Sequence, residues 1–356
     1  MNTGVQSDEP RNVRDGEELD LARLAAYLRD ALDGITGDLE LLQFPSGFSN
    51  LTYLLRMGDK EWVLRRPPFG SKVRAAHDMG REFRVLTALQ GAYPPAPKPL
   101  LHCEDADMLG APFYLMERVR GIILRGKRPR GFHWPPETVR ACCESLVQNL
   151  ADLHALDHEA VGLGALRKEG SFVERQVMGW SERYHASQTD DIPAIDQVVA
   201  WLKEHHPADV KSVLIHNDYK FDNIVLEPAD PSRIVGVLDW EMTTIGDPLM
   251  DLGCALSYWI ERTDVPFGMV PSFLTAEPGA MTRAEVAQRY GEITGQDVSN
   301  LAFYYTFGLF KLAVIVQQIY YRYKKGLTKD ERFAPLIFMV GALGMRAADV
   351  IDTGKV

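Results

Sequence analysis

Three polar side chains in the segment Ser212–Trp240 have types and a spacing that suit phosphoryl transfer. Asp218 precedes Asn223 by five positions, and Asp239 follows at the end of a later apolar run. Phosphoryl transfer needs one group that orients the attacking hydroxyl and accepts its proton, and oxygen ligands for a metal that neutralises the phosphates. Asp218 suits the first role, and Asn223 and Asp239 suit the second.

Three apolar runs predict the strands that position these residues. Val213–Ile215 and Ile224–Leu226 enclose a polar loop, and Ile234–Leu238 leads directly into Asp239. A polar loop held between buried strands is a rigid platform for catalytic side chains. The alternative is that the two aspartates only cap turns, as Asp often does, but the complete spacing favours catalysis.

Lys220 follows the predicted base by two residues. Its ammonium could stabilise the transferred phosphoryl group as charge develops there. A lysine that points into solvent is the alternative.

The motif HNDYKFDN at 216–223, with Asp239 and GDPLMDL at 246–252, resembles the aminoglycoside phosphotransferase family. The resemblance covers roughly residues 40–330, and SNLTY at 49–53 with VLRRPP at 63–68 is most similar to kinase-like domains fused to acyl-CoA dehydrogenases. It implies an α+β, protein-kinase-like bilobal fold with a small β-rich N-lobe and a larger, mainly helical C-lobe. It also implies a kinase that uses ATP or GTP with Mg²⁺.

The resemblance further implies supporting roles for three residues near the loop. His216 would hydrogen-bond the backbone near Asp239, and Asp251 would support the loop. Asp247 would cap the helix that Pro248 begins.

A candidate phosphate-binding loop spans residues 44–50, because small residues let backbone N–H groups approach phosphate oxygens. It contains one glycine, so side chains would supply further donors, and an ordinary turn is the alternative. The candidate ligands are Ser46, Gly47, Ser49 and Asn50.

The next strand should carry a cation for the nucleotide phosphates, paired with a helix carboxylate. Arg65 and Glu82 fill these positions, with Arg66 as a competitor, and strand neighbours face opposite sides. An exposed ion pair is the alternative. By resemblance, backbone groups of Glu117 and Val119 would contact the adenine.

The length of 356 residues predicts two lobes. We expect a disordered tail at 1–16, an N-lobe at 17–120 and a C-lobe at 121–356. Periodicity predicts helices near 19–32 and 75–90, a β-hairpin formed by the runs 51–55 and 62–64, and further strands near 100 and 112–119. The apolar run Phe307–Tyr321 predicts a buried helix, shorter than the ~20 residues that span a bilayer.

The composition of the chain argues against some classes of binding partner and indicates a cellular location. A net charge of −10 argues against nucleic acids and anionic membranes. The four cysteines form no CxxC pair, and residues 1–18 contain no secretory signal, so we expect a cytoplasmic protein.

The acceptor should be a small molecule, because Asp239 is followed within a few residues by Gly246 and leaves no room for the activation segment of protein kinases. A basic run favours an anionic acceptor such as a hydroxyacyl-CoA over an aminoglycoside, and a solvated loop is the alternative. The run contains Arg118, Arg120, Arg125, Lys127, Arg128 and Arg130.

Several alternatives stay open at this stage. Four aromatic residues line either an acceptor pocket or the core: Trp134, Trp180, Tyr184 and Trp259. A nucleotide-binding pseudokinase and an interaction module are the rivals to an enzyme, and an aminoglycoside kinase or a choline or homoserine kinase is the rival within enzymes. The sequence leaves the oligomeric state open.

Overall fold

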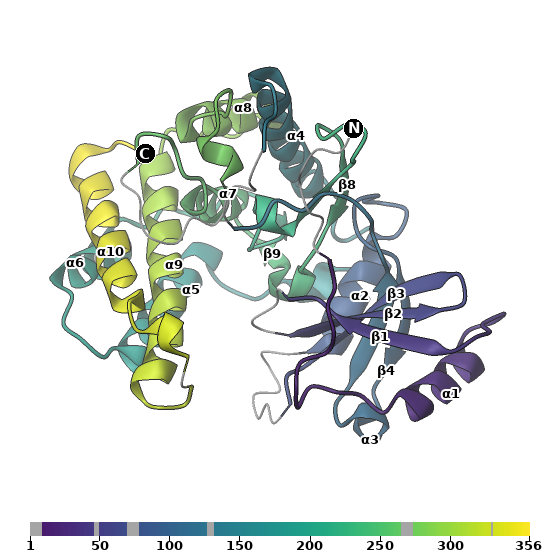
Figure 1. Ribbon diagram of the computed structural model, residues 1–356. Coiled ribbons are helices and arrows are strands. Elements are labelled where there is room, and N and C mark those ends of the chain that lie inside the picture. Colours follow the sequence, from purple (N-terminus) through teal and green to yellow (C-terminus); the bar gives the residue numbers. More distant parts are fainter. Residues whose placement is uncertain (1–8, 46–49, 70–77, 127–131, 265–272, 329) are drawn as a thin grey trace. The chain divides into compact units, whose positions relative to one another are not determined.

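The computed structural model describes residues 9–45, 50–69, 78–126, 132–264, 273–328 and 330–356 (Figure 1). Within these residues the chain forms two compact units. The first comprises residues 9–123, 132 and 223–241, and the second comprises the remaining described residues.

The first unit is built on a five-stranded antiparallel sheet with the strand order β1-β2-β3-β5-β4. Met57 pairs with Lys60, so β2 and β3 are joined by a two-residue loop, and Gly58 supplies the positive φ of 61° that such a loop needs. The strands are β1 (Leu39–Gln43), β2 (Leu51–Met57), β3 (Lys60–Arg66), β4 (Pro99–Cys103) and β5 (Phe113–Glu117). The predicted hairpin is confirmed.

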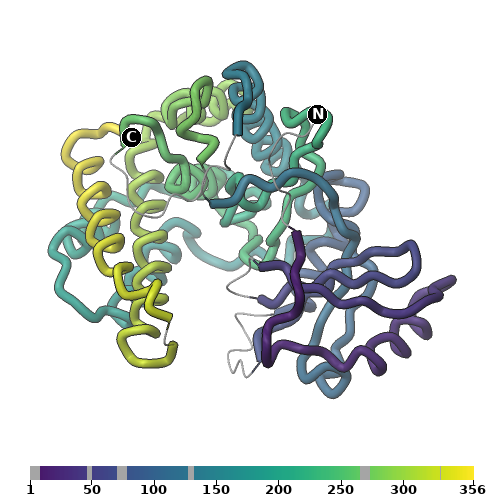
Figure 2. Tube along the Cα trace, in the orientation of Figure 1, coloured from purple at the N-terminus to yellow at the C-terminus, as the bar shows by residue number. Residues whose placement is uncertain are grey.

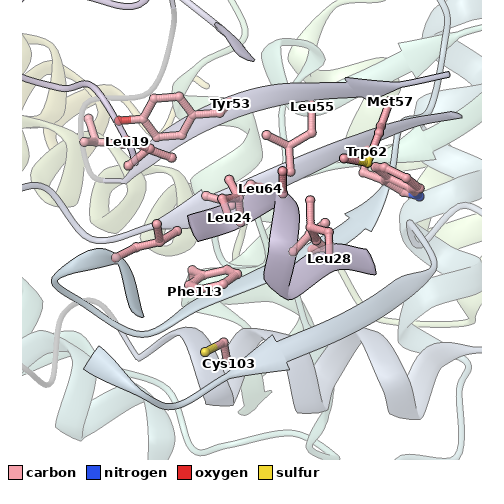
Figure 3. Close-up of a cluster of buried hydrophobic side chains, with 14 residues drawn as sticks. Leu19, Leu24, Leu28, Tyr53, Leu55, Met57, Trp62, Leu64, Cys103 and Phe113 are labelled. Atoms are coloured by element: carbon pink, nitrogen blue, oxygen red, sulfur yellow. The ribbon is translucent and has the colours of Figure 1, made fainter. Parts of the chain in front are cut away.

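One face of this sheet is covered by α1 (Leu21–Ala31). Leu24 and Leu28 point toward alternate residues of the strands, among them Leu55 and Leu64 (Figure 3). Because side chains alternate along a strand, Arg65 lies on the opposite face. The other helices of this unit are α2 (Met79–Leu89), which contacts β4 and β5, and the short α3 (Ala106–Leu109).

A hairpin from late in the chain also belongs to the first unit. It consists of β7 (Ile224–Leu226) and β8 (Ile234–Val237), which pair antiparallel. Ile122 and Leu226 exchange two backbone hydrogen bonds of 2.9 and 2.8 Å, and the Val237 N–H donates to Pro95 O at 2.8 Å. The division therefore differs from the expected one, which assigned every residue after 120 to the C-lobe.

The second unit is mainly helical. Its helices are α4 (Pro136–His154), α5 (Phe172–Ser187), α6 (Pro193–His205), α7 (Pro248–Ser257), α8 (Arg283–Thr294), α9 (Leu301–Lys324) and α10 (Leu336–Thr353). Two short strands, β6 (Val213–Ile215) and β9 (Thr244–Gly246), pair antiparallel. Helix α9 contacts α5, α6, α7 and α10, and α9 and α10 run side by side (Figure 2).

Two glycines let α7 and α9 approach closely. A Cβ atom at Gly253 would lie 2.2 Å from Tyr304 O, and one at Gly308 would lie 2.3 Å from Gly253 O. Both distances are shorter than any real Cβ contact. The backbones of the two helices therefore touch at this crossing.

Two helices among the described residues are long and apolar enough to cross a membrane. They are Leu301–Lys324, with a mean hydropathy of 1.2, and Glu331–Thr353, with a mean hydropathy of 1.6. Core helices of folded proteins pass the same test, and 78% of the first apolar window and 33% of the second are buried. The prediction of a buried helix at 307–321 is confirmed, but α9 is longer than expected.

Candidate active site

The loop that carries Asp218 follows β6, and α7 braces its backbone. Asp251 on α7 accepts hydrogen bonds from the N–H groups of His216 (2.8 Å) and Asn217 (2.7 Å), and it also contacts His154 Nε2 at 3.1 Å. Burial alone would raise the pKa of Asp251, but the hydrogen bonds from His154 and the loop hold it below its usual value. The supporting role implied for Asp251 is confirmed.

Helix α7 itself begins where the sequence indicates. The Asp247 carboxylate accepts from Leu249 N at 2.7 Å and Met250 N at 3.2 Å, and Pro248 occupies the first turn. This cap fixes the start of the helix, and hence the position of Asp251 one turn later.

Asn217 has a left-handed backbone conformation, with φ 66°. Lys311 on α9 donates to its carbonyl oxygen at 2.6 Å and to its Oδ1 at 2.8 Å. Non-glycine residues adopt this conformation at a cost, and asparagine tolerates it best. Lys311 is buried, and its ammonium holds the loop in place. The signal in the sequence that could have revealed this role is a lysine inside an apolar run.

Asp218 and Lys220 form a close pair in this loop. Lys220 Nζ lies 2.7 Å from each carboxylate oxygen of Asp218, and the two side chains are 18% and 17% exposed. The Asp218 N–H donates to His216 Nδ1 at 3.3 Å, and Lys220 Nζ lies 4.4 Å from the centre of the Tyr258 ring. The carboxylate of the predicted base is thus held by Lys220 and its backbone by His216, and the side chain remains partly open to solvent.

In the first unit, the β7–β8 hairpin brings the two predicted metal ligands to one end. Ile224 pairs with Val237, and Leu238 N donates to the carbonyl of Asn223 at 2.8 Å, so Asn223 lies opposite Leu238 and next to Asp239. Asp239 has φ 71°, a strained value typical of functional positions.

This donor set fits Mg²⁺, which keeps several water ligands and takes one or two protein oxygens together with substrate phosphates. Among the described residues, no three His, Cys, Asp or Glu side chains gather as a metal cluster. A site made of Asp239 and Asn223 does not require one.

Arg65 connects two carboxylates of the first unit. Its Nη1 lies 2.8 Å from Glu82 Oε1 and its Nη2 lies 2.9 Å from Asp239 Oδ1. The side chains of Arg65 and Glu82 are 8% and 1% exposed, so the alternative of an exposed ion pair is wrong. Burial alone would lower the pKa of Arg65, but the nearby carboxylates raise it well above its usual value.

Arg66 points to the opposite face, as strand alternation predicts. Its Nε donates to Pro67 O at 3.1 Å, and its guanidinium stacks 3.7 Å from the centre of the Phe69 ring. The choice of Arg65 as the cation beside Glu82 is confirmed, while a contact with phosphate stays a prediction.

Glu241 is a member of this cluster that the sequence did not reveal. Its Oε2 accepts from Asn50 Nδ2 at 2.7 Å and lies 3.6 Å from Arg65 Nη2, and its carbonyl accepts from Arg81 Nη1 at 2.7 Å. Nothing in the local pattern distinguishes this glutamate from a solvated one. Asn50, a predicted phosphate ligand, is therefore anchored beside the predicted metal ligand.

The structure gives less support to the remaining nucleotide-binding candidates. Ser46, Gly47 and Ser49 lie outside the described residues. The Glu117 N–H donates to Lys98 O at 2.8 Å, so this group is not available to an adenine. The Val119 side chain packs against Gly236.

The basic run is partly neutralised by a single carboxylate. Arg118 and Arg120 both pair with Glu61 Oε2, at 2.8 and 2.6 Å. Arg125 Nε donates to the Asp222 carbonyl at 3.0 Å. The other three cations, Lys127, Arg128 and Arg130, lie outside the described residues. The described part of the run therefore supports an anionic acceptor less than its composition indicated.

Two cavities of the second unit meet at one aromatic residue. A cavity of about 10 Å³, room for about one water, is lined by loop residues that include Lys220 and Asp222, with Tyr258 and Trp259. A cavity of about 580 Å³ is also lined by Trp259, together with both apolar and charged side chains. Trp134, Trp180 and Tyr184 are buried and line neither cavity.

The larger cavity carries balanced charge. Leu309, Leu312 and Leu343 form apolar lining. Its charged lining residues are Glu261, Asp264, Arg283, Arg346, Asp349 and Lys355. A cavity of this size is within the range of small-molecule sites.

Comparisons with known proteins agree with this geometry. The model of a family described as "Phosphotransferase enzyme family" matches residues 40–302. The chain is 38% identical over 322 residues, 88% of its length, to acyl-CoA dehydrogenase family member 11 of Rattus norvegicus, of which it covers 41%. It spans less than half the length of each curated relative that it matches.

Solved structures share the fold. A "putative aminoglycoside phosphotransferase" of Ralstonia eutropha is 30% identical with a TM-score of 0.78, and the match covers 93% of this chain and 98% of that one. The choline kinase of Cryptosporidium parvum is 12% identical with a TM-score of 0.63, covering 94% and 97%. The fold is therefore the protein-kinase-like α+β fold that the sequence predicts.

Proposed function

Because the chain belongs to the phosphotransferase enzyme family, we propose that it is a magnesium-dependent small-molecule kinase that transfers the γ-phosphate of ATP or GTP to a hydroxyl group. The observation that carries this proposal is the environment of Asp218. Its carboxylate is partly exposed, receives Lys220 at 2.7 Å and sits on a loop braced by a buried aspartate. A rigidly held carboxylate of this kind suits a general base.

In the proposed reaction, Asp218 accepts the proton of the acceptor hydroxyl as its oxygen attacks the γ-phosphorus. The new oxygen–phosphorus bond forms while the bond from the γ-phosphorus to the bridging oxygen breaks, and the nucleoside diphosphate leaves. Lys220 bonds both oxygens of Asp218, so it has to release one of them first. Its ammonium then offers positive charge to the transferred group.

Asn223 and Asp239 are the residues that would hold the metal ion. When bound, Mg²⁺ neutralises phosphate charge. Arg65 pairs with Asp239 at 2.9 Å, and we propose that it also contacts the nucleotide phosphates, since a guanidinium is a good phosphate ligand.

We propose an anionic hydroxy compound, such as a hydroxyacyl-CoA, as the acceptor. Relatives that are about twice as long carry the name acyl-CoA dehydrogenase. The cavity beside Trp259 has apolar lining suited to an acyl chain, and its charge balance does not favour a polycation. We further propose a reducing, cytoplasmic location, with which four buried thiols are compatible.

The test is consumption of ATP in the presence of a panel of acceptors. We expect hydroxyacyl-CoA compounds to stimulate consumption more than kanamycin-like amines or choline. Asp218→Asn should retain nucleotide binding and lose transfer by ~10²–10⁴-fold, the usual contribution of a positioned base.

Two results would overturn this proposal. Nucleotide binding without turnover for every acceptor would indicate a pseudokinase or an interaction module. Stimulation by aminoglycosides alone would leave a kinase but exclude the anionic acceptor.

A further inference from the structure

We propose that the cavity of about 580 Å³ binds the acceptor as an amphipathic chain, with its polar head at Arg346 and its aliphatic tail between α9 and α10. The ligand class is a straight-chain hydroxy acid or its thioester. This inference rests on the proposed function, because it names the part of the second unit that selects the acceptor. It assigns that selection to two helices outside the motif that carries Asp218.

The course of α9 and α10 gives the cavity one polar and one apolar end. The two helices are consecutive and lie side by side (Figure 2). Tyr305 lies near the start of α9, and its ring centre is 5.9 Å from Cζ of Arg346, in the second half of α10. The helices are therefore antiparallel, and residues after Tyr305 on α9 face residues before Arg346 on α10.

The residues that continue this cavity lining at helical spacing are apolar. They are Leu309 and Leu312 on α9, and Leu343 and Met339 on α10. Leu312 lies seven residues beyond Tyr305, which is about 10 Å along a helix axis. An aliphatic tail can therefore lie between the helices, with its end beside Leu312 and Met339.

Arg283 connects the polar end of the cavity to the loop that carries Asp218. Its guanidinium lies 5.3 Å from the centre of the Tyr305 ring, and its Nη1 donates to Trp259 O at 2.9 Å. The centre of the Trp259 ring lies 5.8 Å from that of Phe221, which belongs to the loop. The head of the ligand therefore lies toward the loop, and its tail points away.

The two arginines that line this end differ in how firmly they are paired. Arg283 is 4% exposed and holds both oxygens of Asp264, at 2.6 and 2.8 Å. Arg346 Nη1 pairs with Asp349 at 2.5 Å, but that carboxylate is 55% exposed. Exposed ion pairs contribute little, whereas a guanidinium binds carboxylates strongly and donates to carbonyl oxygens. A ligand can therefore replace Asp349 at Arg346.

The first experiment is calorimetric titration of the full chain, without nucleotide, with hydroxy acids and with their CoA thioesters. Both classes offer a carbonyl oxygen to Arg346, and the class that binds more tightly identifies the head group. The affinity should rise about fourfold for each methylene group added between hydroxybutyrate and hydroxyoctanoate, because the tail is buried. An affinity that does not depend on chain length, or no binding of either class, would overturn the inference.

Met339→Trp tests the apolar end. Met339 lines the cavity and is only half-buried, so the larger side chain can be accommodated without disrupting the core. The affinity for the eight-carbon ligand should fall roughly tenfold or more, the effect of two methylene groups left in water, while that for the four-carbon ligand stays unchanged. The matched control is Met345→Trp on the same helix, 63% exposed and not among the lining residues. An equal loss for both chain lengths would contradict the assignment of the tail.

Arg346→Gln tests the polar end. Loss of a charge-assisted hydrogen bond should weaken the binding of every chain length by the same factor, roughly 10- to 100-fold. The control is Arg322→Gln, at an exposed position of α9 that does not line the cavity, and it should bind as the parent does. Parent-like affinity in Arg346→Gln would contradict the assignment of the head.

An assay of ATP consumption separates this inference from the proposed function. If the ligands bind with these dependences but none is phosphorylated, the proposed function is wrong and the cavity remains a site for amphipathic chains. If they are phosphorylated and Met339→Trp keeps the parent's preference for the longer chain, the inference is wrong and the kinase activity stands.

Discussion

Arg65 is the residue on which the charge balance of the first unit depends. Its guanidinium contacts Glu82, Asp239 and Glu241 at 2.8, 2.9 and 3.6 Å. A buried charge is tolerated only when it is paired. Glu82 is almost fully buried, so its carboxylate needs the Arg65 cation. We therefore expect Arg65 to be required for the stability of the fold, whether or not it also binds phosphate.

Replacement of Arg65 by methionine should therefore destabilise the protein. The change leaves Glu82 buried without its cation, and we expect a loss of about 3–5 kcal/mol in the free energy of unfolding. Arg65→Lys should cost less, since it keeps the charge but cannot form the two-pronged contact. Urea denaturation measures both values.

The adjacent arginine is the matched control. Arg66 is also buried but makes no ion pair within the described residues, so Arg66→Met should be close to neutral. Equal losses at the two positions would show that the carboxylates do not depend on Arg65.

The residues that the sequence could identify are those with a local signature. Asp218, Asn223 and Asp239 follow a motif, and strand alternation separates Arg65 from Arg66. Glu241 has no such signature, because its role depends on which distant side chains it approaches.

At the scale of elements, the crossing of α7 and α9 sets the geometry of the loop that carries Asp218. Helix α7 contributes Asp251, and α9 contributes Lys311. Their separation at Gly253 and Gly308 is fixed by direct backbone contact. A change in this separation would move Asp251 and Lys311 relative to each other, and these two side chains hold the loop.

Gly308→Ala should consequently lower both stability and activity. The added methyl group would lie 2.3 Å from a backbone oxygen, and overpacking of this kind costs about 1–3 kcal/mol or more. Thermal or urea unfolding, followed by an assay of transfer, measures the two effects.

Gly341→Ala on α10 is the control for helix propensity. A Cβ atom there meets nothing within 4 Å, so alanine should stabilise the helix by about 0.5–1 kcal/mol. If Gly308→Ala also proved stabilising, the close approach of the two helices would be excluded.

Most elements were predictable from periodicity, but their assignment to units was not. The pattern predicted strands at 213–215, 224–226 and 234–238, and all three are present, with β8 ending at Val237. That β7 and β8 pack in the first unit depends on contacts with Ile122 and Pro95. Such pairings over a hundred residues leave no mark in a local sequence pattern.

At the scale of the whole molecule, α10 presents an exposed apolar side. Phe338 is 78% exposed and Met345 is 63% exposed, whereas Val340 and Ala347 are fully buried. The buried residues lie on the side of α10 that packs against the unit, where α10 contacts α9 and α6. The helix therefore has the two-sided character of a surface helix in a folded unit.

We expect the double substitution Phe338→Glu and Met345→Glu to leave the fold unchanged. The partition of the protein between supernatant and sedimented membranes should not change either. Exposed positions usually contribute within about 0.5 kcal/mol to the free energy of unfolding. The variant and the parent should both remain in the supernatant when membranes are sedimented.

Val340→Glu supplies the contrast, because it places a charge in the buried side and should unfold the helix. A parent protein that sediments with membranes, and a double variant that does not, would instead indicate that α10 inserts into lipid.

The four cysteines allow the local unfolding of each unit to be followed by thiol labelling. All four lie in the described part of the chain, all are buried, and none forms a disulfide. Burial raises the pKa of Cys143 to about 12, and it also raises the pKa of Cys254. Since a thiol reagent reacts with the exposed thiolate, the rate of labelling reports the free energy of local opening. The labelling rate of Cys103 would report the free energy of local opening of the sheet in the first unit. The labelling rates of Cys142, Cys143 and Cys254 would report the same free energy for the helices of the second unit.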